Sequence, residues 1–193
     1  MKSIVVFCGS SEGNNPTYKE QAYALGKAMA AQGIRLVYGG AKVGLMGAVA
    51  DGVLQNGGEA IGVIPGFLQT KEIAHEQLTE LIVVDTMHER KLKMHELSDG
   101  IITLPGGFGT MEEFFEMLTW AQLGLHQKPI GLLDTNDFYS HLFSLVDVMV
   151  NEGFLKASNR DMLLMEKNID NLLAQMHAYV APEVPKWITK QTT

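Results

Sequence analysis

Residues 100–113, GIITLPGGFGTMEE, contain the local pattern that decides the fold. A short apolar run over 100–105 leads into three glycines at positions 106, 107 and 109, and two carboxylates follow at 112 and 113. A parallel strand covered on both faces has a continuous apolar sequence, without polar alternation. The glycine turn and the periodic residues after it therefore predict a strand, a tight turn and a helix, the repeating unit of α/β proteins.

The same unit recurs along the chain. Strands are predicted over 3–8, 34–38, 59–65, 81–84, 100–105, 129–134 and, as a last edge strand, 162–165. Helices are predicted from a capping-box pattern at Thr17 and Glu20 to Gly33, and over 44–56, 87–97, 110–124, 137–151 and 168–179. This alternation predicts an α/β protein with a three-layer, Rossmann-like fold, in which helices flank a central parallel sheet. We expect one domain over 1–181 and an irregular tail over 182–193.

The composition narrows the classes of partner. The chain has 193 residues, 46% of them hydrophobic, and a formal net charge of -7 at pH 7. An acidic chain lacks the basic surface that nucleic acids and anionic membranes require, so we expect neither as a partner. The single cysteine, Cys8, excludes an internal disulfide, and the N-terminal residues lack the layout of a signal peptide. No apolar stretch is long enough to span a bilayer, and we expect a cytoplasmic location.

Glycines gather where the predicted strands end. Gly9-Ser10, Gly39-Gly40 and Pro105-Gly106-Gly107 each follow an apolar run. In open parallel sheets the ligand binds beyond the carboxyl ends of the strands, where glycine allows the backbone to approach it closely. Residues 39–47, GGAKVGLMG, match neither the GxGxxG fingerprint nor a Walker A motif. These glycines therefore either approach a ligand or only shape a tight turn, and the pattern leaves both interpretations open.

The turn PGGFGT, residues 105–110, is the stronger candidate for binding an anion. Its backbone N–H groups could form a nest for phosphate oxygens, with the Thr110 hydroxyl as a further donor and the positive end of the helix dipole behind it. The alternative is a simple helix start, in which Thr110 is the N-cap and Glu113 completes a capping box. The spacing alone does not decide between them.

Residues 86–96, TMHERKLKMHE, supply an unusual concentration of positive charge in an acidic chain. Thr86 and Glu89 have capping-box spacing, which predicts a structural role for Glu89. On a helix Met87, Arg90 and Lys91 share one face. Arg90 or Lys91 is therefore a candidate to clamp a phosphate or ribose, and arginine suits bidentate recognition better than lysine. The alternative is a solvated basic face.

The remaining reactive side chains point to no metal and no cofactor. His88 and His95 lie seven positions apart without a third ligand at metal-binding spacing, and a structural zinc site would favour cysteines. Cys8 lacks an evident base partner, so we expect a core residue rather than a nucleophile. Ser10 lacks the GxSxG context of a hydrolase elbow.

With these motifs in view, the sequence resembles the LONELY GUY family of cytokinin riboside 5′-monophosphate phosphoribohydrolases, often labelled possible lysine decarboxylases. The resemblance extends in the same order from residue 3 to about residue 180. The family pattern PGGxGTxxE is matched by Pro105, Gly106, Gly107, Gly109, Thr110 and Glu113. The accompanying motifs are matched by Met87, Arg90 and Lys91, by Gly39, Gly40, Gly44, Leu45, Met46 and Gly47, and by Cys8 to Ser11.

The resemblance implies hydrolysis of the N-glycosidic bond of a purine riboside 5′-monophosphate, either of adenosine or of an N6-modified adenosine, to the free base and ribose 5-phosphate. It implies Arg90 and Glu113 as the catalytic pair and a homodimer or higher homo-oligomer. The phosphate would lie on the turn, and the Glu113 carboxylate would stabilise the positive charge that develops at C1′. Glu112 or Glu116 would assist. The expected substrate-binding residues are Gly9, Ser10, Gly39, Gly40, Gly44, Met46, Met87, Lys91, Pro105, Gly106, Gly107, Gly109, Thr110 and Glu112.

Other functions remain as alternatives. A protein of this fold could carry a nucleotide or pterin phosphate without chemistry. A pyridoxal-phosphate decarboxylase requires a Schiff-base lysine, and Lys42 is the sole lysine within the glycine-rich strand ends. A dinucleotide oxidoreductase is disfavoured because the GxGxxG fingerprint is missing. The motifs do not separate AMP from an N6-prenylated AMP, since the two differ by one apolar group.

Overall fold

The structure is a computed structural model that describes residues 1–68 and 74–183. All strands of the described chain join one sheet in the order β4-β3-β2-β1-β5-β6-β7, and every neighbouring pair is parallel. This confirms the predicted parallel sheet. The strands are β1 (Ser3–Phe7), β2 (Arg35–Tyr38), β3 (Ala60–Pro65), β4 (Glu80–Val84), β5 (Gly100–Thr103), β6 (Ile130–Leu133) and β7 (Leu163–Glu166).

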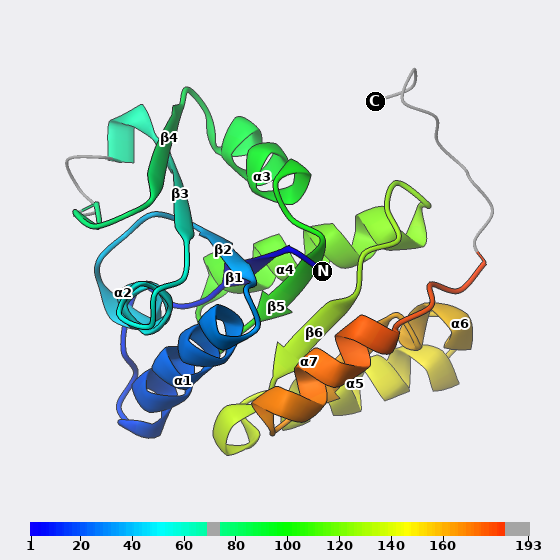
Figure 1. Cartoon of the computed structure of the whole chain (residues 1–193). Helices are drawn as coiled ribbons and strands as arrows, with labels where there is room; N and C mark the ends of the chain where they lie inside the picture. The colour runs from blue at the N-terminus through cyan, green and yellow to red at the C-terminus, as the bar shows by residue number, and fades with distance from the viewer. Residues whose placement is uncertain (69–73, 184–193) are drawn as a thin grey trace.

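Helices cover both faces of the sheet (Figure 1). Buried side chains of α1, α2 and α7 form one core with the sheet, while those of α3 and α4 form a second core on the opposite face. The three-layer prediction is thus confirmed. The helices are α1 (Thr17–Ala31), α2 (Gly44–Leu54), α3 (Met87–Glu96), α4 (Phe108–Gln122), α5 (Ser140–Asn151), α6 (Ala157–Arg160) and α7 (Ile169–Ala178), with short 3-10 turns η1 (Gly66–Leu68) and η2 (Thr135–Asp137).

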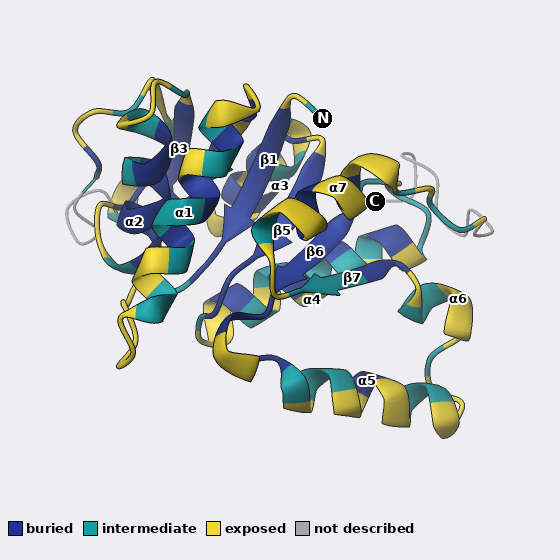
Figure 2. Cartoon of the chain, turned by 60° about the horizontal axis from the view of Figure 1, so that its bottom comes forward, coloured by how far each residue is buried: buried dark blue, intermediate teal, exposed yellow. Residues whose placement is uncertain are grey.

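The central strand β1 shows why the predicted strands lack polar alternation. Ile4 and Val6 belong to the core under α1 and α2, whereas Val5 and Phe7 belong to the core under α3 and α4. Successive side chains of a strand point to opposite faces, so a strand buried on both sides is apolar throughout. In Figure 2 the central strands are accordingly buried along their length, and the outer faces of the helices are exposed.

The strand order indicates where a ligand-binding crevice opens. The chain moves outward from β1 through β2 to β4 on one side, and then returns to β5 on the other side of β1. The order therefore reverses between β1 and β5. Such a switch point opens a crevice beyond the carboxyl ends of the two strands. Residues 8–10 and 104–107, which follow β1 and β5, meet there: the Gly9 N–H donates to the Pro105 carbonyl over 3.0 Å.

Several predicted boundaries differ from the structure. The helix predicted over 137–151 begins at Ser140, because Asn136 and Asp137 adopt positive φ angles of 55° and 57°. The capping box predicted at Thr17 is wrong: Pro16 is the N-cap, and the Asn15 side chain accepts from the Thr17 N–H. Helix α6 and turn η1 were too short for a periodic signal. The predicted tail lies outside the described residues from position 184 onward. No helix in the described ranges has the length and hydrophobicity needed to cross a bilayer.

Candidate active site

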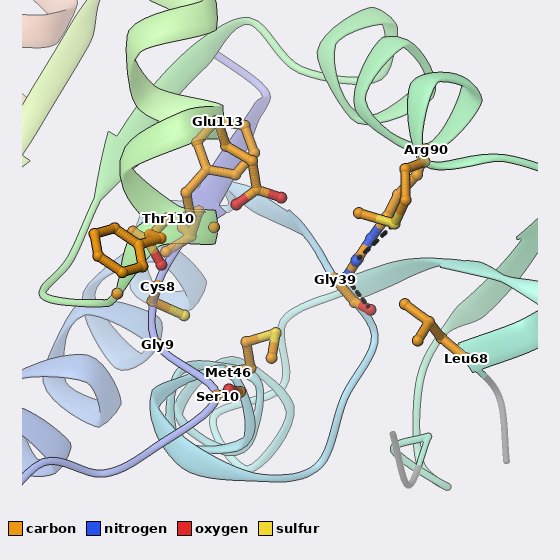
Figure 3. A pocket seen from close by; sticks show the side chains of 15 residues that line it. Cys8, Gly9, Ser10, Gly39, Met46, Leu68, Arg90, Thr110 and Glu113 are labelled. Carbon is orange, nitrogen blue, oxygen red and sulfur yellow. Dashed lines mark hydrogen bonds between the residues drawn. The ribbon is translucent and has the colours of Figure 1, made fainter. Parts of the chain in front are cut away.

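A cavity of about 360 Å³ opens at the switch point (Figure 3). Its walls come from the ends of β1 and β2, from α2 and α3, and from the first turn of α4. Arg90 from α3 and Glu113 from α4 extend into it from different helices. The predicted site residues that line this cavity are Gly9, Ser10, Gly39, Met46, Met87, Arg90, Gly107, Gly109, Thr110 and Glu113.

The first turn of α4 supplies backbone donors. Gly107 is the N-cap, and the first helical hydrogen bond runs from the Met111 N–H to the Gly107 carbonyl over 3.1 Å. The helix therefore offers no carbonyl to the preceding N–H groups of Phe108, Gly109 and Thr110. All three residues line the cavity. This start also contradicts the alternative capping box, because Thr110 lies inside the helix and Gly107 occupies the N-cap position.

The glycines of the turn fall into two groups. A Cβ added to Gly106 would lie 2.2 Å from Thr110 Oγ1 and 2.9 Å from the Gly9 N, so Gly106 is required for packing. Apart from its immediate surroundings in the backbone, a Cβ added to Gly107 or Gly109 would meet no atom of the described residues within 4 Å. Neither of these two has the positive φ that favours glycine. The space beside Gly107 and Gly109 belongs to the cavity, so packing within the chain does not explain why these residues are glycine.

The two adjacent carboxylates of α4 have different surroundings. Glu112 pairs with Lys91 Nζ at 2.5 Å, and Glu116 pairs with the same nitrogen at 3.0 Å. Glu113 lies one residue further around the helix and lines the cavity instead. Successive residues of a helix point about 100° apart, which explains the separation. Glu112 thus links α4 to α3 through Lys91, whereas Glu113 lies at the cavity.

Arg90 is 6% exposed and held by backbone acceptors. Its Nε donates to the Val63 carbonyl and its Nη2 to the Gly39 carbonyl, each over 3.0 Å. The helix that carries it is capped as predicted, since Thr86 Oγ1 accepts from the Glu89 N–H over 3.1 Å. The Glu89 carboxylate accepts from the Asp85 N–H, not from Thr86, so only half of the predicted capping box forms.

The other predicted substrate-binding residues lie outside this cavity. Lys91 and Glu112 face each other between α3 and α4. Pro105 and Gly106 line a neighbouring cavity of about 340 Å³. Gly40 and Gly44 shape the loop before α2, where their φ angles are +82° and +62°.

Cys8 is buried, as predicted, although it touches the cavity. Burial raises the pKa of its thiol well above the usual range, and the negative charge of Glu113 raises it further. The thiolate is the nucleophilic form of cysteine. The surroundings of Cys8 therefore suppress nucleophilic chemistry.

Five lining residues were not among the predicted site residues: Val6, Phe7, Cys8, Leu68 and Phe108. Phe108 is 97% exposed at the start of α4, and Leu68 ends η1. Phe108 occupies the variable position of PGGxGT, where a large apolar residue between glycines was the available signal. Leu68 follows β3 without any recognisable motif. Together with Met46 and Met87 they give the cavity an apolar side.

The donor set suits a phosphate ester better than a metal or pyridoxal phosphate. Within residues 1–68 and 74–183, no group of three or more His, Cys, Asp or Glu side chains could hold a metal ion. None of the described lining residues is a lysine. Lys42, the lysine that a decarboxylase would need here, lies 4.0 Å from Glu76 and is about half exposed.

Comparison with solved structures supports the fold. The molybdenum cofactor binding protein of Rippkaea orientalis superposes with a TM-score of 0.69 at 23% identity, covering 92% of this chain and 97% of that one. The Moco carrier protein of Chlamydomonas reinhardtii gives a TM-score of 0.68 at 22% identity, with 91% and 95% coverage. Identities this low establish a shared fold and no shared function.

Sequence comparison identifies the family. The model described as "Possible lysine decarboxylase" matches residues 46–176. A cytokinin riboside 5′-monophosphate phosphoribohydrolase of Rhodococcoides fascians is 47% identical, over 92% of this chain and 90% of its own length. A probable enzyme of the same name from Oryza sativa subsp. japonica is 46% identical, over 93% and 85%. An Arabidopsis thaliana enzyme of that name is 44% identical, over 93% and 84%. The chain therefore belongs to the family of cytokinin riboside 5′-monophosphate phosphoribohydrolases.

Proposed function

We propose that this protein hydrolyses the N-glycosidic bond of a cytokinin riboside 5′-monophosphate, releasing the free base and ribose 5-phosphate. The observation that carries the proposal is that Arg90, Glu113 and the first turn of α4 line one cavity. Relatives at 44–47% identity bear the name of this activity. The same cavity would accept AMP, which lacks only the N6 substituent.

The phosphate would bind at the first turn of α4. The N–H groups of Phe108, Gly109 and Thr110 and the positive end of the helix dipole favour an anion there. The open space beside Gly107 and Gly109 lets a phosphate oxygen approach the backbone closely. The local donors explain how a chain of net charge -7 would bind an anionic substrate.

Glu113 would act at the ribose. It lies one helical turn beyond Thr110, so its carboxylate reaches past a phosphate bound at the helix start. When the bond between C1′ and the base nitrogen breaks, its electron pair leaves with the base and C1′ becomes cationic. A carboxylate stabilises that charge. Water then bonds to C1′, and its proton passes through Glu113 to the departing base.

Arg90 would bind ribose or phosphate oxygens and keep a positive charge near the Glu113 carboxylate. A nearby cation favours the ionised form of a carboxyl group. The guanidinium is planar and carries donors in a fixed arrangement, which suits recognition of paired oxygens. The two side chains would thus act together on the sugar.

The apolar side of the cavity would contact the base. This side consists of the flexible thioethers of Met46 and Met87, the Leu68 side chain and the exposed ring of Phe108. Such a surface accepts a purine and gains from an added isoprenoid group by roughly 0.8 kcal/mol per buried CH₂. We therefore propose a preference for the N6-prenylated substrate over AMP.

The test is incubation of the purified protein with AMP and with isopentenyladenosine monophosphate, followed by chromatography of the free base. Glu113→Gln and Arg90→Ala should each reduce kcat/KM by roughly 10²-fold or more, as expected for groups that stabilise transition-state charge. Glu112→Gln is the matched control because it changes the neighbouring carboxylate, which faces Lys91 instead of the cavity. Its kcat/KM should remain within a few-fold of wild type.

Failure of both nucleotides to react would contradict the proposal. Binding of an unaltered nucleotide would then favour the carrier alternative. If the two variants kept wild-type rates while base was released, another set of residues would carry the reaction. Equal loss in Glu112→Gln and Glu113→Gln would show that the helix as a whole, and not the lining carboxylate, is required.

We further propose that the protein acts as a homodimer. Two of the apolar side chains that line the site remain exposed, Met87 at 38% and Phe108 at 97%. Leu92 on α3 and Val83 on the edge strand β4 are also exposed, at 48% and 52%. Large exposed apolar side chains commonly mark an interface. Light scattering coupled to size-exclusion chromatography would measure the mass; a value near 21.2 kDa would contradict the dimer.

A further inference from the structure

We infer that Gly39 is a positioning residue for Arg90: it is glycine because the guanidinium occupies the space where a Cβ would lie. The inference rests on the proposed function, in which Arg90 acts on the substrate. It changes the expected role of Gly39, which the family resemblance placed among the substrate-binding residues. Figure 3 shows the Arg90 side chain extending from α3 to the Gly39 carbonyl at the cavity wall.

The guanidinium of Arg90 is held between two neighbouring strands. Gly39 directly follows β2, and Val63 lies in β3, which pairs with β2 in parallel register. Each residue accepts one hydrogen bond of 3.0 Å from a different nitrogen of Arg90. Two acceptors fixed by the sheet define both the position and the plane of the guanidinium. Its plane matters because the donor geometry of arginine is rigid.

Space, and not backbone conformation, requires glycine at position 39. An added Cβ would lie 2.2 Å from Arg90 Nη2, 3.3 Å from Arg90 Cζ and 3.0 Å from Met46 Sδ. Cβ atoms essentially never lie within 3.0 Å of non-bonded atoms, so the end of the Arg90 side chain would have to shift. Gly39 is absent from the glycines with positive φ. An alanine could therefore adopt this backbone, and the contacts it would disturb are those with the Arg90 head group and the Met46 thioether.

The adjacent Gly40 shows the contrast. Its φ is +82°, which strains any side chain there, and an added Cβ would approach the Gly62 backbone and not Arg90. Gly40 thus shapes the turn, whereas Gly39 makes room for the guanidinium. A methyl group at position 39 would displace Nη2 from the Gly39 carbonyl. The guanidinium would then move relative to Glu113 while both helices kept their places.

The test is a double-mutant cycle with Gly39→Ala and Arg90→Ala. We expect Gly39→Ala alone to reduce kcat/KM by about 10²-fold, the scale of a misplacement near 1 Å, and to lower Tm. In the Arg90→Ala background the clash with the guanidinium is gone, so Gly39→Ala should change kcat/KM by less than about twofold and should no longer lower Tm. Gly66→Ala is the control. It follows the neighbouring strand β3 and has no positive φ, and among residues 1–68 and 74–183 an added Cβ would meet only Val83 Cγ1, at 3.8 Å.

Measuring both Tm and kcat/KM distinguishes a failure of this inference from a failure of the proposed function. Coupling in both Tm and kcat/KM supports the positioning role. Additive effects in Tm, or wild-type kcat/KM in Gly39→Ala, would overturn it. If wild type cleaves no nucleotide yet the Tm cycle shows coupling, the proposed function fails while the packing of Arg90 against Gly39 stands. Equal losses in Gly39→Ala and Gly66→Ala would mean that neither strand end tolerates an added methyl group, and would also overturn the inference.

Discussion

The Lys91 Nζ lies 2.5 Å from Oε1 of Glu112, and this ion pair joins α3 to α4. Each partner is the immediate neighbour of a proposed catalytic residue, because Arg90 precedes Lys91 and Glu113 follows Glu112. The lysine side chain is 7% exposed and also pairs with Glu116 at 3.0 Å. Lys91 therefore links the two helices that carry the active side chains through two carboxylates, and loss of Glu112 alone would still leave the pair with Glu116.

Replacement of Lys91 by methionine should reduce both stability and activity. Methionine keeps most of the apolar stem but leaves two carboxylates without their cation, which should lower the unfolding free energy by about 2 kcal/mol. Burial acts to lower the pKa of Lys91, yet hydrogen bonds to Glu112 and Glu116 outweigh it and the pKa is raised. Chemical denaturation would measure the loss. Lys19→Met is the matched control, because its pair with Glu12 is 53% exposed on both sides and should contribute less than about 0.5 kcal/mol. Equal losses in both variants would show that the α3–α4 pair has no special role.

Gly109→Ala should stabilise the fold but weaken substrate binding. Alanine is favoured over glycine in a helix by roughly 0.5–1 kcal/mol, and the added Cβ would clash with none of the residues that the structure describes. The same methyl group would occupy space that we assign to the phosphate, so KM should rise about tenfold or more. Denaturation and steady-state kinetics on one preparation would test the expected rise in unfolding free energy and the expected rise in KM. Gly106→Ala should instead destabilise, because its Cβ would lie 2.2 Å from Thr110 Oγ1. A Gly109→Ala enzyme with unchanged KM would contradict a phosphate at this turn.

The strands and the lining motifs could be predicted because each depends on local sequence. Burial on both faces left continuous apolar runs, and the turn before α4 needed glycines at fixed positions. The partners of Arg90, Lys91 and Glu112 could not be predicted, since they depend on how α3 packs against α4 and against strands β2 and β3. From spacing alone Lys91 and Arg90 were equal candidates for the crevice. Tertiary packing turns Lys91 toward α4 and Arg90 toward the strand ends. The contact between Gly39 and Arg90 could not be predicted for the same reason, because these residues are 51 positions apart and meet only through tertiary packing.

Tyr139 should hold the glycine turn before α4, where we place the substrate phosphate, from outside the cavity. Its hydroxyl donates to the Leu104 carbonyl over 2.7 Å, directly before Pro105, and its N–H donates to the Asp134 carboxylate over 2.8 Å. Tyr139→Phe would leave a buried carbonyl without this donor, so the unfolding free energy should fall by about 1–2 kcal/mol and KM should rise. Tyr23→Phe is the control, because the Tyr23 hydroxyl bonds to Gln55 at an exposed site. A stability loss in Tyr139→Phe with unchanged kinetics would restrict the hydroxyl to a structural role.

Stability should fall as the pH decreases below about 6.5, and His126 should contribute to that fall. Its Nδ1 accepts from the Lys128 N–H over 3.1 Å, so Nε2 carries the proton and donates to the Met117 carbonyl over 3.0 Å. Burial lowers the pKa of His126 from 6.5 to about 4; the bond to Met117 opposes this shift, and the charge of Lys128 reinforces it. His95, whose ring centroid lies 4.9 Å away, has a pKa lowered to about 3, again chiefly by burial.

Between pH 6.5 and pH 4 the unfolded chain therefore binds a proton at His126 that the native protein does not. Unfolding is then favoured as the pH falls, and the effect ends once the native side chain is also protonated. At pH 5 the difference for His126 amounts to about 2 kcal/mol relative to neutral pH. Urea denaturation across this range would give the slope of unfolding free energy against pH. His126→Gln should reduce that slope by up to one proton, whatever its effect at neutral pH. An identical slope in the variant would show that His126 titrates alike in both states.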